Sequence, residues 1–352
     1  MAVDLGKFVS EVKKEIAFED LSGKTIAVDA YNTIYQFLSI IRQPDGMPLM
    51  DSKGRVTSHL SGLFYRTTNL IGYRINPVFV FDGIPPLLKQ KTLEARASRR
   101  ATAAKEWEEA KAKGMIEEAR VHAVASTKIN KEIVASAKQL LDLMGVPYIQ
   151  APSEGEAQAA EMVKSGLAYA SASQDYDSFL FGADVVIRNF TLTGKRRIPK
   201  RNITVDVKLE RIFLKDLLEH LGINQKQLIW LGMLVGTDFN SGIEKVGPKT
   251  ALKIVSGAKT LDDVIGYVKG RYGAEFDTDP VEVERLFEKP EAEEIGAPEF
   301  NRLVSGKKPD KAGLIEFMCR EHGFSEERIG KYADKLSDAG SGRGQKGIGS
   351  WL

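Results

Sequence analysis

The sequence contains only one cysteine and four histidines among its 352 residues. A single cysteine, Cys319, excludes a disulfide within the chain, and its apolar neighbours indicate a thiol packed in the core. Zinc sites built from cysteine and histidine need these residues at short, regular spacings. The histidines lie too far apart in the sequence to supply such a site, at His59, His122, His220 and His322. Any bound metal ion must therefore be held by oxygen ligands.

The sequence also lacks a long hydrophobic run and a large excess of charge of either sign. Its longest apolar stretch, residues 228–236, is less than half of the roughly 20 residues that a membrane-spanning helix needs. We therefore expect an intracellular protein with no membrane partner. The 50 basic and 48 acidic residues leave a net charge of +2, so a nucleic-acid partner would have to be recognised by local patches.

Charge is distributed unevenly along the chain. Basic residues are concentrated in residues 88–105 and 188–215. Residues 275–299 are strongly acidic and contain three prolines, which indicates a solvated connector with short helices.

Five short apolar runs of the strand type lie in the first part of the chain, separated by helical patterns. The best helical pattern extends from Ile129 to Met144 and ends at the stop signal Gly145, followed by Pro147. This alternation predicts an α/β fold with a mostly parallel central sheet and helices on both faces. The apolar runs are residues 25–28, 78–81, 146–149, 168–172 and 185–187.

The strand signal ends near residue 215, which divides the chain into three predicted parts. Residues 1–215 form an α/β core of the size of a nuclease domain, and residues 216–336 form a helical region. Residues 337–352 form a flexible tail, because five glycines lie within residues 340–352 and disfavour a packed helix.

Acidic residues follow the predicted strands at the points where the strands end. In an open parallel sheet, ligands bind outside the carboxyl ends of the strands, so we expect these side chains to converge on one crevice. The set is Asp29, Asp82, Glu154, Glu156, Asp175 and Asp177, and Asp238 is a candidate seventh member.

Each acid also has a purely structural interpretation. Asp29 and Asp177 could cap helices, and Ser153 to Glu156 matches a capping box. Six carboxylates around one crevice would nevertheless repel one another strongly without cations. Mg²⁺ prefers oxygen ligands and is held by a few carboxylates together with substrate phosphates. Since two such ions can activate water and stabilise a leaving oxygen, the pattern indicates phosphodiester hydrolysis.

Two cations, Lys89 and Arg96, follow Asp82. They are seven residues apart, which is two turns of a helix, and so project from the same face. From there they could reach the scissile phosphate and offset the charge that develops on it. A solvated basic helix face is the alternative, and the neighbouring acids favour the catalytic interpretation.

Residues 242–250 have the form of a helix-hairpin-helix motif. Gly242 and Gly247 flank a turn, and a helix is predicted to begin near Pro248. The backbone N–H groups of such a turn, the helix N-terminus and Lys249 would bind a DNA phosphate without reading the bases. The alternative is a plain glycine turn between packed helices.

The last residues combine polar and apolar side chains in a helical spacing. Ile348, Trp351 and Leu352 lie at positions i, i+3 and i+4. An exposed tryptophan in a tail favours a single turn that folds into a hydrophobic pocket of a partner.

The order of these motifs resembles that of the flap endonucleases, members of the Rad2/XPG group of structure-specific nucleases. The tail from Gln345 resembles the peptide box that docks on the sliding clamp (PCNA), with Leu352 in place of the final aromatic residue. The matching strings cover nearly the whole chain and are IAVDA at 26–30, TSHL at 57–60, VFVFDG at 78–83, APSEGEA at 151–157, SQDYD at 173–177 and GTD at 236–238.

The resemblance implies a PIN-like 5′ nuclease core with a helical arch at about residues 85–130. It implies cleavage of 5′ flaps in DNA replication, including Okazaki fragment maturation, and in repair, together with 5′-3′ exonuclease activity. The short tail resembles that of archaeal members, which implies a cytoplasmic or nucleoid location, or a nuclear one in a eukaryote. A monomer is expected.

The resemblance also assigns roles to individual residues. Two Mg²⁺ ions, for which Mn²⁺ could substitute, would be bound by the seven acids Asp29, Asp82, Glu154, Glu156, Asp175, Asp177 and Asp238. The catalytic residues would be Lys89, Arg96 and Asp177. Tyr35 would stack on a base near the cut, and the pocket for a one-nucleotide 3′ flap would be lined by Arg42, Thr57 and Arg66. The clamp contacts would be Gln345, Ile348, Trp351 and Leu352.

Three alternatives share part of this pattern. Another Rad2/XPG nuclease, one that cuts bubbles or junctions or acts only as a 5′ exonuclease, would have the same acids, but the compact arch and the clamp box favour flap cleavage. A non-catalytic adaptor would use the hairpin and the tail to bring the clamp to branched DNA, and its acids would be helix caps. A small PIN-type ribonuclease would not need residues 215–352.

Overall fold

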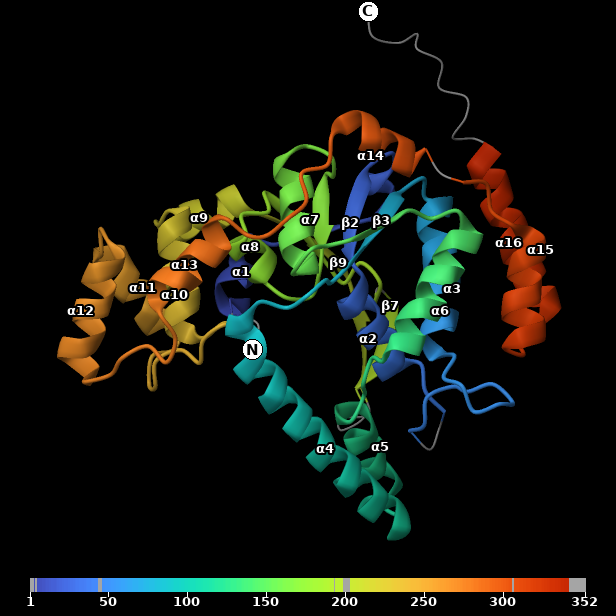
Figure 1. Cartoon of the computed structure of the whole chain (residues 1–352), viewed down its shortest axis with the longest axis horizontal. Coiled ribbons are helices and arrows are strands. Elements are labelled where there is room, and N and C mark those ends of the chain that lie inside the picture. The colour runs from blue at the N-terminus through green and yellow to red at the C-terminus, as the bar shows by residue number, and fades with distance from the viewer. Residues whose placement is uncertain are drawn as a thin grey trace, which may run out of the picture.

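A seven-stranded sheet lies at the centre of the computed structural model, which describes residues 3, 5–43, 46–192, 194–198, 203–305 and 307–341 (Figure 1). Its strand order is β1-β9-β6-β5-β2-β3-β4. A separate antiparallel hairpin consists of β7 (Gly194–Ile198) and β8 (Ile203–Val207). The strands of the central sheet are β1 (Lys14–Ile16), β2 (Thr25–Asp29), β3 (Asn76–Phe81), β4 (Tyr148–Gln150), β5 (Ala170–Ala172), β6 (Val185–Arg188) and β9 (Leu209–Phe213).

The sheet is mostly parallel, as predicted. Strands β2, β3, β4, β5 and β6 pair in parallel, and β9 and β1 extend the sheet with antiparallel pairs. The chain passes from β2 through β3 to β4 on one side, and then returns to place β5 and β6 on the other side of β2. The order therefore reverses between β2 and β5. This reversal is called the topological switch point, and in such sheets ligands bind there, outside the carboxyl ends of the strands.

Side chains on the central strands alternate between two buried layers. In β2, Ile26 and Val28 pack into one hydrophobic cluster and Ala27 packs into another on the opposite face. In β3, Phe79 belongs to the first cluster, and Val80 belongs to the second. Because both faces are covered, the strands appear in the sequence as continuous apolar runs rather than as alternating patterns.

Helices cover both faces of the sheet, and a further group of helices, called the lobe, lies beside it (Figure 1). One face is covered by α2 (Ala30–Ile40), α3 (Ser58–Gly72) and α6 (Lys131–Met144), with α15 (Lys311–Leu314), the π-helical turn Ile315–Glu321 and α16 (Glu326–Ser341) outside them. The other face is covered by α7 (Gly155–Lys164) and α14 (Ala297–Val304). The lobe consists of α1 (Gly6–Val12), α8 (Asp177–Leu180), α9 (Leu214–Leu221), α10 (Gln225–Val235), α11 (Pro248–Gly257), α12 (Leu261–Tyr272) and α13 (Pro280–Glu288).

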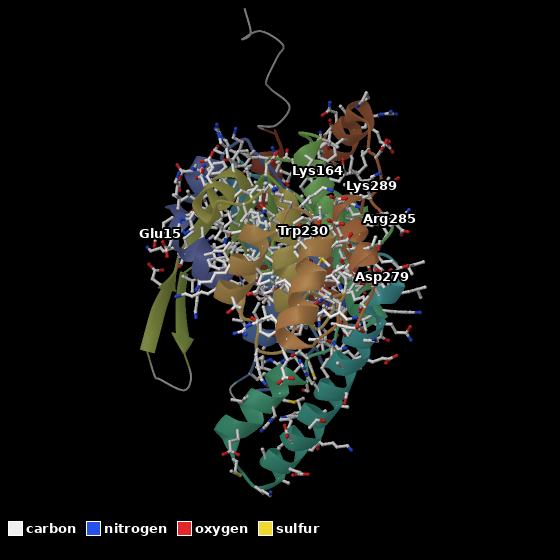
Figure 2. All side chains as sticks on the ribbon, turned by 90° about the vertical axis from the view of Figure 1, so that its left-hand side faces the viewer. Glu15, Lys164, Trp230, Asp279, Arg285 and Lys289 are labelled. Carbon is white, nitrogen blue, oxygen red and sulfur yellow. The ribbon has the colours of Figure 1, made fainter. Side chains whose placement is uncertain are left out.

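Two helices form an arm that extends away from the body, as Figures 1 and 2 show from two directions. It begins with the 3₁₀ turn Leu87–Lys89, continues as α4 (Gln90–Ala112) and returns as α5 (Ile116–Ala125). The two helices are joined by small buried side chains, among them Ala103, Ala110 and Ala123. This arm occupies the residues predicted to form an arch.

Within the lobe, α10 and α13 are joined by a hydrogen bond between side chains in addition to their apolar contacts. The indole of Trp230, labelled in Figure 2, is buried and donates a 2.7 Å hydrogen bond to Oε1 of Glu284. The short helices α13 and α14 lie in and beside the acidic segment at 275–299, in agreement with the prediction of short helices there.

The ends of three helices agree with one local prediction and differ from two others. Helix α6 ends at Gly145 with φ of 66°, as the stop signal predicted. The capping box at Ser153 to Glu156 is wrong, because α7 is preceded by Glu154, whose side chain makes no capping hydrogen bond. Helix α16 continues to Ser341, into the segment predicted to be a tail.

Cys319 is half-buried and packs against the core, as predicted from its apolar neighbours. No helix in the described part of the chain combines the length and apolar character needed to cross a membrane.

Candidate active site

The acids identified in the sequence analysis lie near the carboxyl ends of the parallel strands, at the switch point. Asp29 is the last residue of β2, and Asp82 directly follows β3. Glu154 and Glu156 lie at the start of α7, after β4, while Asp175 and Asp177 follow β5. Asp238 reaches the same place from the segment between α10 and α11.

Mutual electrostatic effects show that the seven carboxylates form one group. The charges of Asp82 and Asp175 both act on Asp29, and Asp29 in turn acts on Glu156. Asp238 acts on Asp82, Glu154, Asp175 and Asp177. The structure therefore brings together all of the acids that the sequence analysis placed in one crevice.

Two of the acids are oriented by backbone N–H groups at the starts of helices. Oδ1 of Asp29 accepts a 2.9 Å hydrogen bond from the N–H of Asn32, so this residue caps α2 as well as facing the cluster. Oδ1 of Asp82 accepts a 2.7 Å hydrogen bond from the N–H of Gly155, the first residue of α7. The close approach requires glycine, because a Cβ at this position would lie 2.6 Å from Oδ1 of Asp82.

The remaining contacts come from residues that are distant in the sequence. The N–H of Val3 donates a 2.9 Å hydrogen bond to Oδ1 of Asp177. The side-chain amide of Asn32 donates a 3.2 Å hydrogen bond to Oδ2 of Asp175, and Oγ of Ser178 donates a 3.1 Å hydrogen bond to Glu156. Sequence reasoning missed these three positioning residues, because their roles depend on tertiary contacts.

Burial and mutual repulsion make most of these carboxylates costly to ionise. Burial, followed by the charge of Asp82, raises the pKa of Asp29 well above its usual value, and burial with Asp175 does the same for Glu156. Burial raises the pKa of Asp177 to about 7. Burial is also the largest cause of the raised pKa values of Asp82, Glu154 and Asp175.

Two cations of the arm enter this acidic cluster. Nζ of Lys89 contacts Glu154 and lies 3.2 Å from Oδ2 of Asp238, and Arg96 forms an ion pair with the other oxygen of Asp238. Burial acts to lower the pKa of Lys89, but the charges of Glu154 and Asp238 outweigh it and raise the pKa. Burial likewise acts to raise the pKa of Asp238, yet Lys89 and Arg96 lower it.

The donor set fits hard divalent cations. Among the described residues, Lys89 and Arg96 form ion pairs with these seven carboxylates, and Arg188 acts on Asp175, so negative charge remains in excess. Oxygen ligands are those that Mg²⁺ prefers. In the present side-chain positions, no three acidic, imidazole or thiol groups of the described residues form a complete metal-binding set, and Lys89 lies between two of the acids.

The residues expected to contact DNA lie on α2, on α3 and in the segment between them. Tyr35 is 41% exposed on α2, and Arg66 on α3 is half-buried, which lowers its pKa. Thr57 is buried directly before α3. Nη1 of Arg42 donates a 2.7 Å hydrogen bond to the carbonyl of Gly46, and Nη2 donates to Thr127 after the arm. Arg42 thus ties this segment to the arm.

The predicted hairpin at 242–250 joins α10 to α11. Gly242 has φ of 77°, and a Cβ there would lie 2.6 Å from the carbonyl of Val235. Gly247 precedes α11, which begins at Pro248, and Lys249 is exposed in the first turn. The expected clamp contacts Gln345, Ile348, Trp351 and Leu352 lie outside the described residues.

Two family models match the chain, the XPG N-terminal domain over residues 1–103 and the XPG I-region over residues 145–238. Together they contain all seven acids of the cluster. The fold, the switch-point carboxylates and these two regions define a protein of the XPG class.

Comparison with individual proteins narrows this class. Flap endonuclease 1 of Pyrococcus abyssi is 49% identical, with 100% of this chain and 98% of that protein covered, and flap endonuclease 1 of Methanococcoides burtonii is 47% identical with both chains fully covered. The solved structure of flap endonuclease-1 from Methanococcus jannaschii covers 97% of this chain and 99% of its own, with a TM-score of 0.75 and 37% identity. The chain belongs to the flap endonuclease 1 family, which confirms the resemblance found in the sequence.

The fold extends to more distant proteins. The catalytic core of Rad2, solved in complex with a DNA substrate, matches with a TM-score of 0.71 at 23% identity and covers 96% of this chain and 100% of its own. At this identity the match shows a shared fold.

Proposed function

We propose that this protein is a metal-dependent, structure-specific nuclease that cleaves 5′ flaps in branched DNA and also acts as a 5′-3′ exonuclease, in replication and repair. The observation that carries the proposal is the convergence of seven carboxylates at the switch point, with Lys89 and Arg96 directed into them. The family membership supports the choice of substrate. In the reaction, water adds to phosphorus and the bond to the 3′ oxygen breaks, which leaves a 5′ phosphate on the retained strand.

Asp29, Asp82, Glu154, Glu156, Asp175, Asp177 and Asp238 would hold two Mg²⁺ ions, for which Mn²⁺ could substitute. Bound divalent cations supply activation of the attacking water and stabilisation of the leaving oxygen. The protein contributes a fixed donor set, because Asp29, Asp82 and Asp177 each accept a backbone hydrogen bond that limits the rotation of the carboxylate. Such second contacts orient ligands and are part of the site.

Lys89 and Arg96 would bind the scissile phosphate. Both belong to the start of the arm, and both are held near the acids by ion pairs with Asp238. A phosphate entering the cluster can replace a carboxylate as partner of these cations, which would place positive charge where negative charge develops in the transition state. The unpaired strand would pass the arm.

The rest of the DNA would be held without reading its sequence. The hairpin at Gly242 and Gly247, with Lys249, offers backbone N–H groups and a cation to a phosphate. Tyr35 is exposed and available for stacking on a base, and Arg42, Thr57 and Arg66 would form the 3′-flap pocket.

The partners and the setting are also proposals. We propose that the C-terminal residues Gln345, Ile348, Trp351 and Leu352 dock on the sliding clamp, that the protein acts as a monomer, and that it works in the cytoplasm or nucleoid of an archaeal cell.

A cleavage assay tests the proposed function. A double-flap DNA with a one-nucleotide 3′ flap, labelled at its 5′ end, is incubated with wild type, Asp177→Ala or the exposed control Asp334→Ala, in Mg²⁺ or EDTA. We expect one product of defined length from wild type and the control, only in Mg²⁺. Binding without cleavage in every condition would favour the adaptor instead, and a ladder of short products would indicate an exonuclease.

A further inference from the structure

The connection between β3 and the arm carries the most exposed large apolar side chains among the described residues. Ile84 is 81% exposed and Leu87 is 87% exposed, whereas the next value, that of Val281, is 56%. Both lie within five residues of Asp82, and Leu87 is two residues before Lys89. Solvent-exposed apolar groups of this size, gathered beside a charged site, indicate a surface that binds something.

The backbone that carries these side chains is fixed. The N–H of Gly83 donates a 2.6 Å hydrogen bond to the carbonyl of Ser153, and that of Ile84 donates a 3.1 Å bond to the carbonyl of Pro152. A Cβ on Gly83 would lie 2.2 Å from the carbonyl oxygen of Ala151, so the backbone of Gly83 lies directly against that of Ala151. Two prolines follow Ile84, and their rings restrict the backbone further.

The neighbouring residue shows that the exposure is selective. Leu88 packs against the hydrophobic core of the helical lobe, while Leu87 beside it faces solvent. Leu88 and the 2.9 Å hydrogen bond from the N–H of Lys89 to the carbonyl of Pro86 hold the 3₁₀ turn in place. The backbone of Ile84 and Leu87 is thus held in place, so little backbone conformational entropy is lost when these residues bind a partner.

We infer that Ile84 and Leu87, with Pro85 and Pro86 between them, form an apolar wedge that packs against the bases of the unpaired strand next to the scissile bond. This inference rests on the proposed function. Proteins that unstack DNA insert Ile, Leu or Pro between base steps, and the unstacked base presents an apolar face. The cations that follow, Lys89, Arg96 and the exposed Arg99, are placed for the phosphates of the same strand.

Two kinds of group would then bind the unpaired strand, the basic side chains and the apolar wedge. Basic side chains hold the backbone and depend on salt, whereas the wedge holds the bases and discriminates an unpaired strand from a stacked one. It would act on substrate binding and leave the chemistry at the carboxylates unchanged.

A cycle of changes in protein and DNA tests the inference. The double variant Ile84→Ser/Leu87→Ser is compared with wild type and with Val281→Ser, an exposed apolar control on α13. Each protein is tested on the flap DNA and on the same DNA with abasic residues at the two unpaired nucleotides nearest the junction. Multiple-turnover cleavage in Mg²⁺ over a range of DNA concentrations gives kcat and KM, and fluorescence anisotropy in EDTA gives Kd.

We expect the double variant to raise KM and Kd for the intact flap by roughly tenfold, with kcat at saturating DNA unchanged. Abasic DNA should raise KM and Kd of wild type by a similar factor. It should have no further effect on KM and Kd of the double variant, because the contact is already lost. Val281→Ser should match wild type on both DNAs. Independent, additive losses, an unchanged Kd, or a loss in kcat alone would each overturn the wedge. If wild type cuts no flap, the proposed function fails, and the binding cycle in EDTA still decides whether the wedge contacts bases.

Discussion

Nζ of Lys89 lies 3.2 Å from Oδ2 of Asp238 and also contacts Glu154. The first turn of the arm is thereby joined to the segment between α10 and α11. Lys89 thus neutralises part of the negative charge that divalent cations would otherwise offset. Ion pairs and metal ions are therefore expected to compete for the same carboxylates.

This competition predicts the behaviour of Lys89→Ala. Without the ammonium group, Glu154 and Asp238 lose a counter-ion, so the variant should unfold at a lower temperature than wild type in EDTA. Mg²⁺ should then raise its melting temperature more than that of wild type, by roughly 2 °C or more. Thermal unfolding in EDTA and in Mg²⁺ measures both effects. Lys311→Ala, which removes an exposed ion pair with Asp334, is the control, and equal Mg²⁺ shifts in wild type and Lys89→Ala would contradict the idea.

Asp177→Asn should separate stability from activity. Asparagine retains an oxygen that can accept the hydrogen bond from Val3, but it removes a charge whose burial raises the pKa to about 7. In EDTA at pH 8 the variant should therefore be more stable than wild type, by roughly 1–3 kcal/mol, while its cleavage activity in Mg²⁺ is lost. Urea unfolding and single-turnover cleavage measure the two quantities. A variant that is both less stable and inactive would show that the carboxylate is structurally required.

His59 should lower the stability of the folded chain in mild acid, whereas the buried carboxylates with raised pKa values act in the opposite direction. The ring is 1% exposed, its Nε2 lies 2.8 Å from Oγ of Ser136, and burial lowers its pKa to about 3. The unfolded chain protonates this ring near pH 6.5 and the folded chain does not, so the contribution of His59 to the free energy of unfolding falls as the pH drops below 6.5. The contribution of His59 should approach 1.4 kcal/mol per pH unit at about pH 5. Urea unfolding from pH 7.5 to pH 5 should show a free energy of unfolding that decreases less, or increases more, on acidification for His59→Gln than for wild type, and equal pH dependences would reject this assignment.

A buried contact anchors the segment between α2 and α3 to the C-terminal part of the chain. Nδ1 of His322 lies 3.1 Å from Oδ2 of Asp51, and Asp51 also accepts hydrogen bonds from Lys53 and Arg55. Asp51→Ala should cost about 2 kcal/mol of unfolding free energy and speed amide exchange in residues 50–56. The exposed ion-pair variant Asp334→Ala should change stability by less than about 0.5 kcal/mol. Similar losses in both variants would show that burial of the contact is unimportant.

Sequence patterns predicted the parallel centre of the sheet because its strands are buried on both faces. Each of the five apolar runs overlaps a strand of the structure, and the acids lie at or after the ends of those strands as expected. By contrast, β1, β7, β8 and β9 were not predicted. Residues 14–16 and 209–213 carry charged side chains at an antiparallel edge, and such strands are defined by their pairing rather than by apolar composition.

The candidate site was predicted as a set of acids, but its internal contacts were not. The capping-box interpretation failed because Glu156 accepts a hydrogen bond from Ser178 and faces the other acids instead of capping its own helix. The hydrogen bond from Val3 to Asp177 joins residues 174 positions apart in the sequence, and no local pattern encodes it. Likewise, the ion pairs of Lys89 and Arg96 depend on how the arm is docked.

Gly155 offers the sharpest test of the geometry at the carboxylates. Its N–H donates a 2.7 Å hydrogen bond to Oδ1 of Asp82, and a Cβ would lie 2.6 Å from that same oxygen. Gly155→Ala should therefore displace the Asp82 carboxylate by a fraction of an ångström or more. Misplacement of about 1 Å in an active site can cost on the order of 10²-fold in rate, and we expect a loss of that size in single-turnover cleavage.

The matched control is Gly266→Ala, in α12, where a Cβ would meet open space. Alanine there should raise the unfolding free energy by about 0.5–1 kcal/mol, because it restricts the unfolded chain and favours the helix, and cleavage should be unchanged. Comparison of urea unfolding and cleavage rates in the two variants distinguishes a displaced carboxylate from a general effect of alanine. Cleavage at the wild-type rate by Gly155→Ala would mean that Asp82 does not need the position seen here, and its proposed role as a metal ligand would then have to be abandoned.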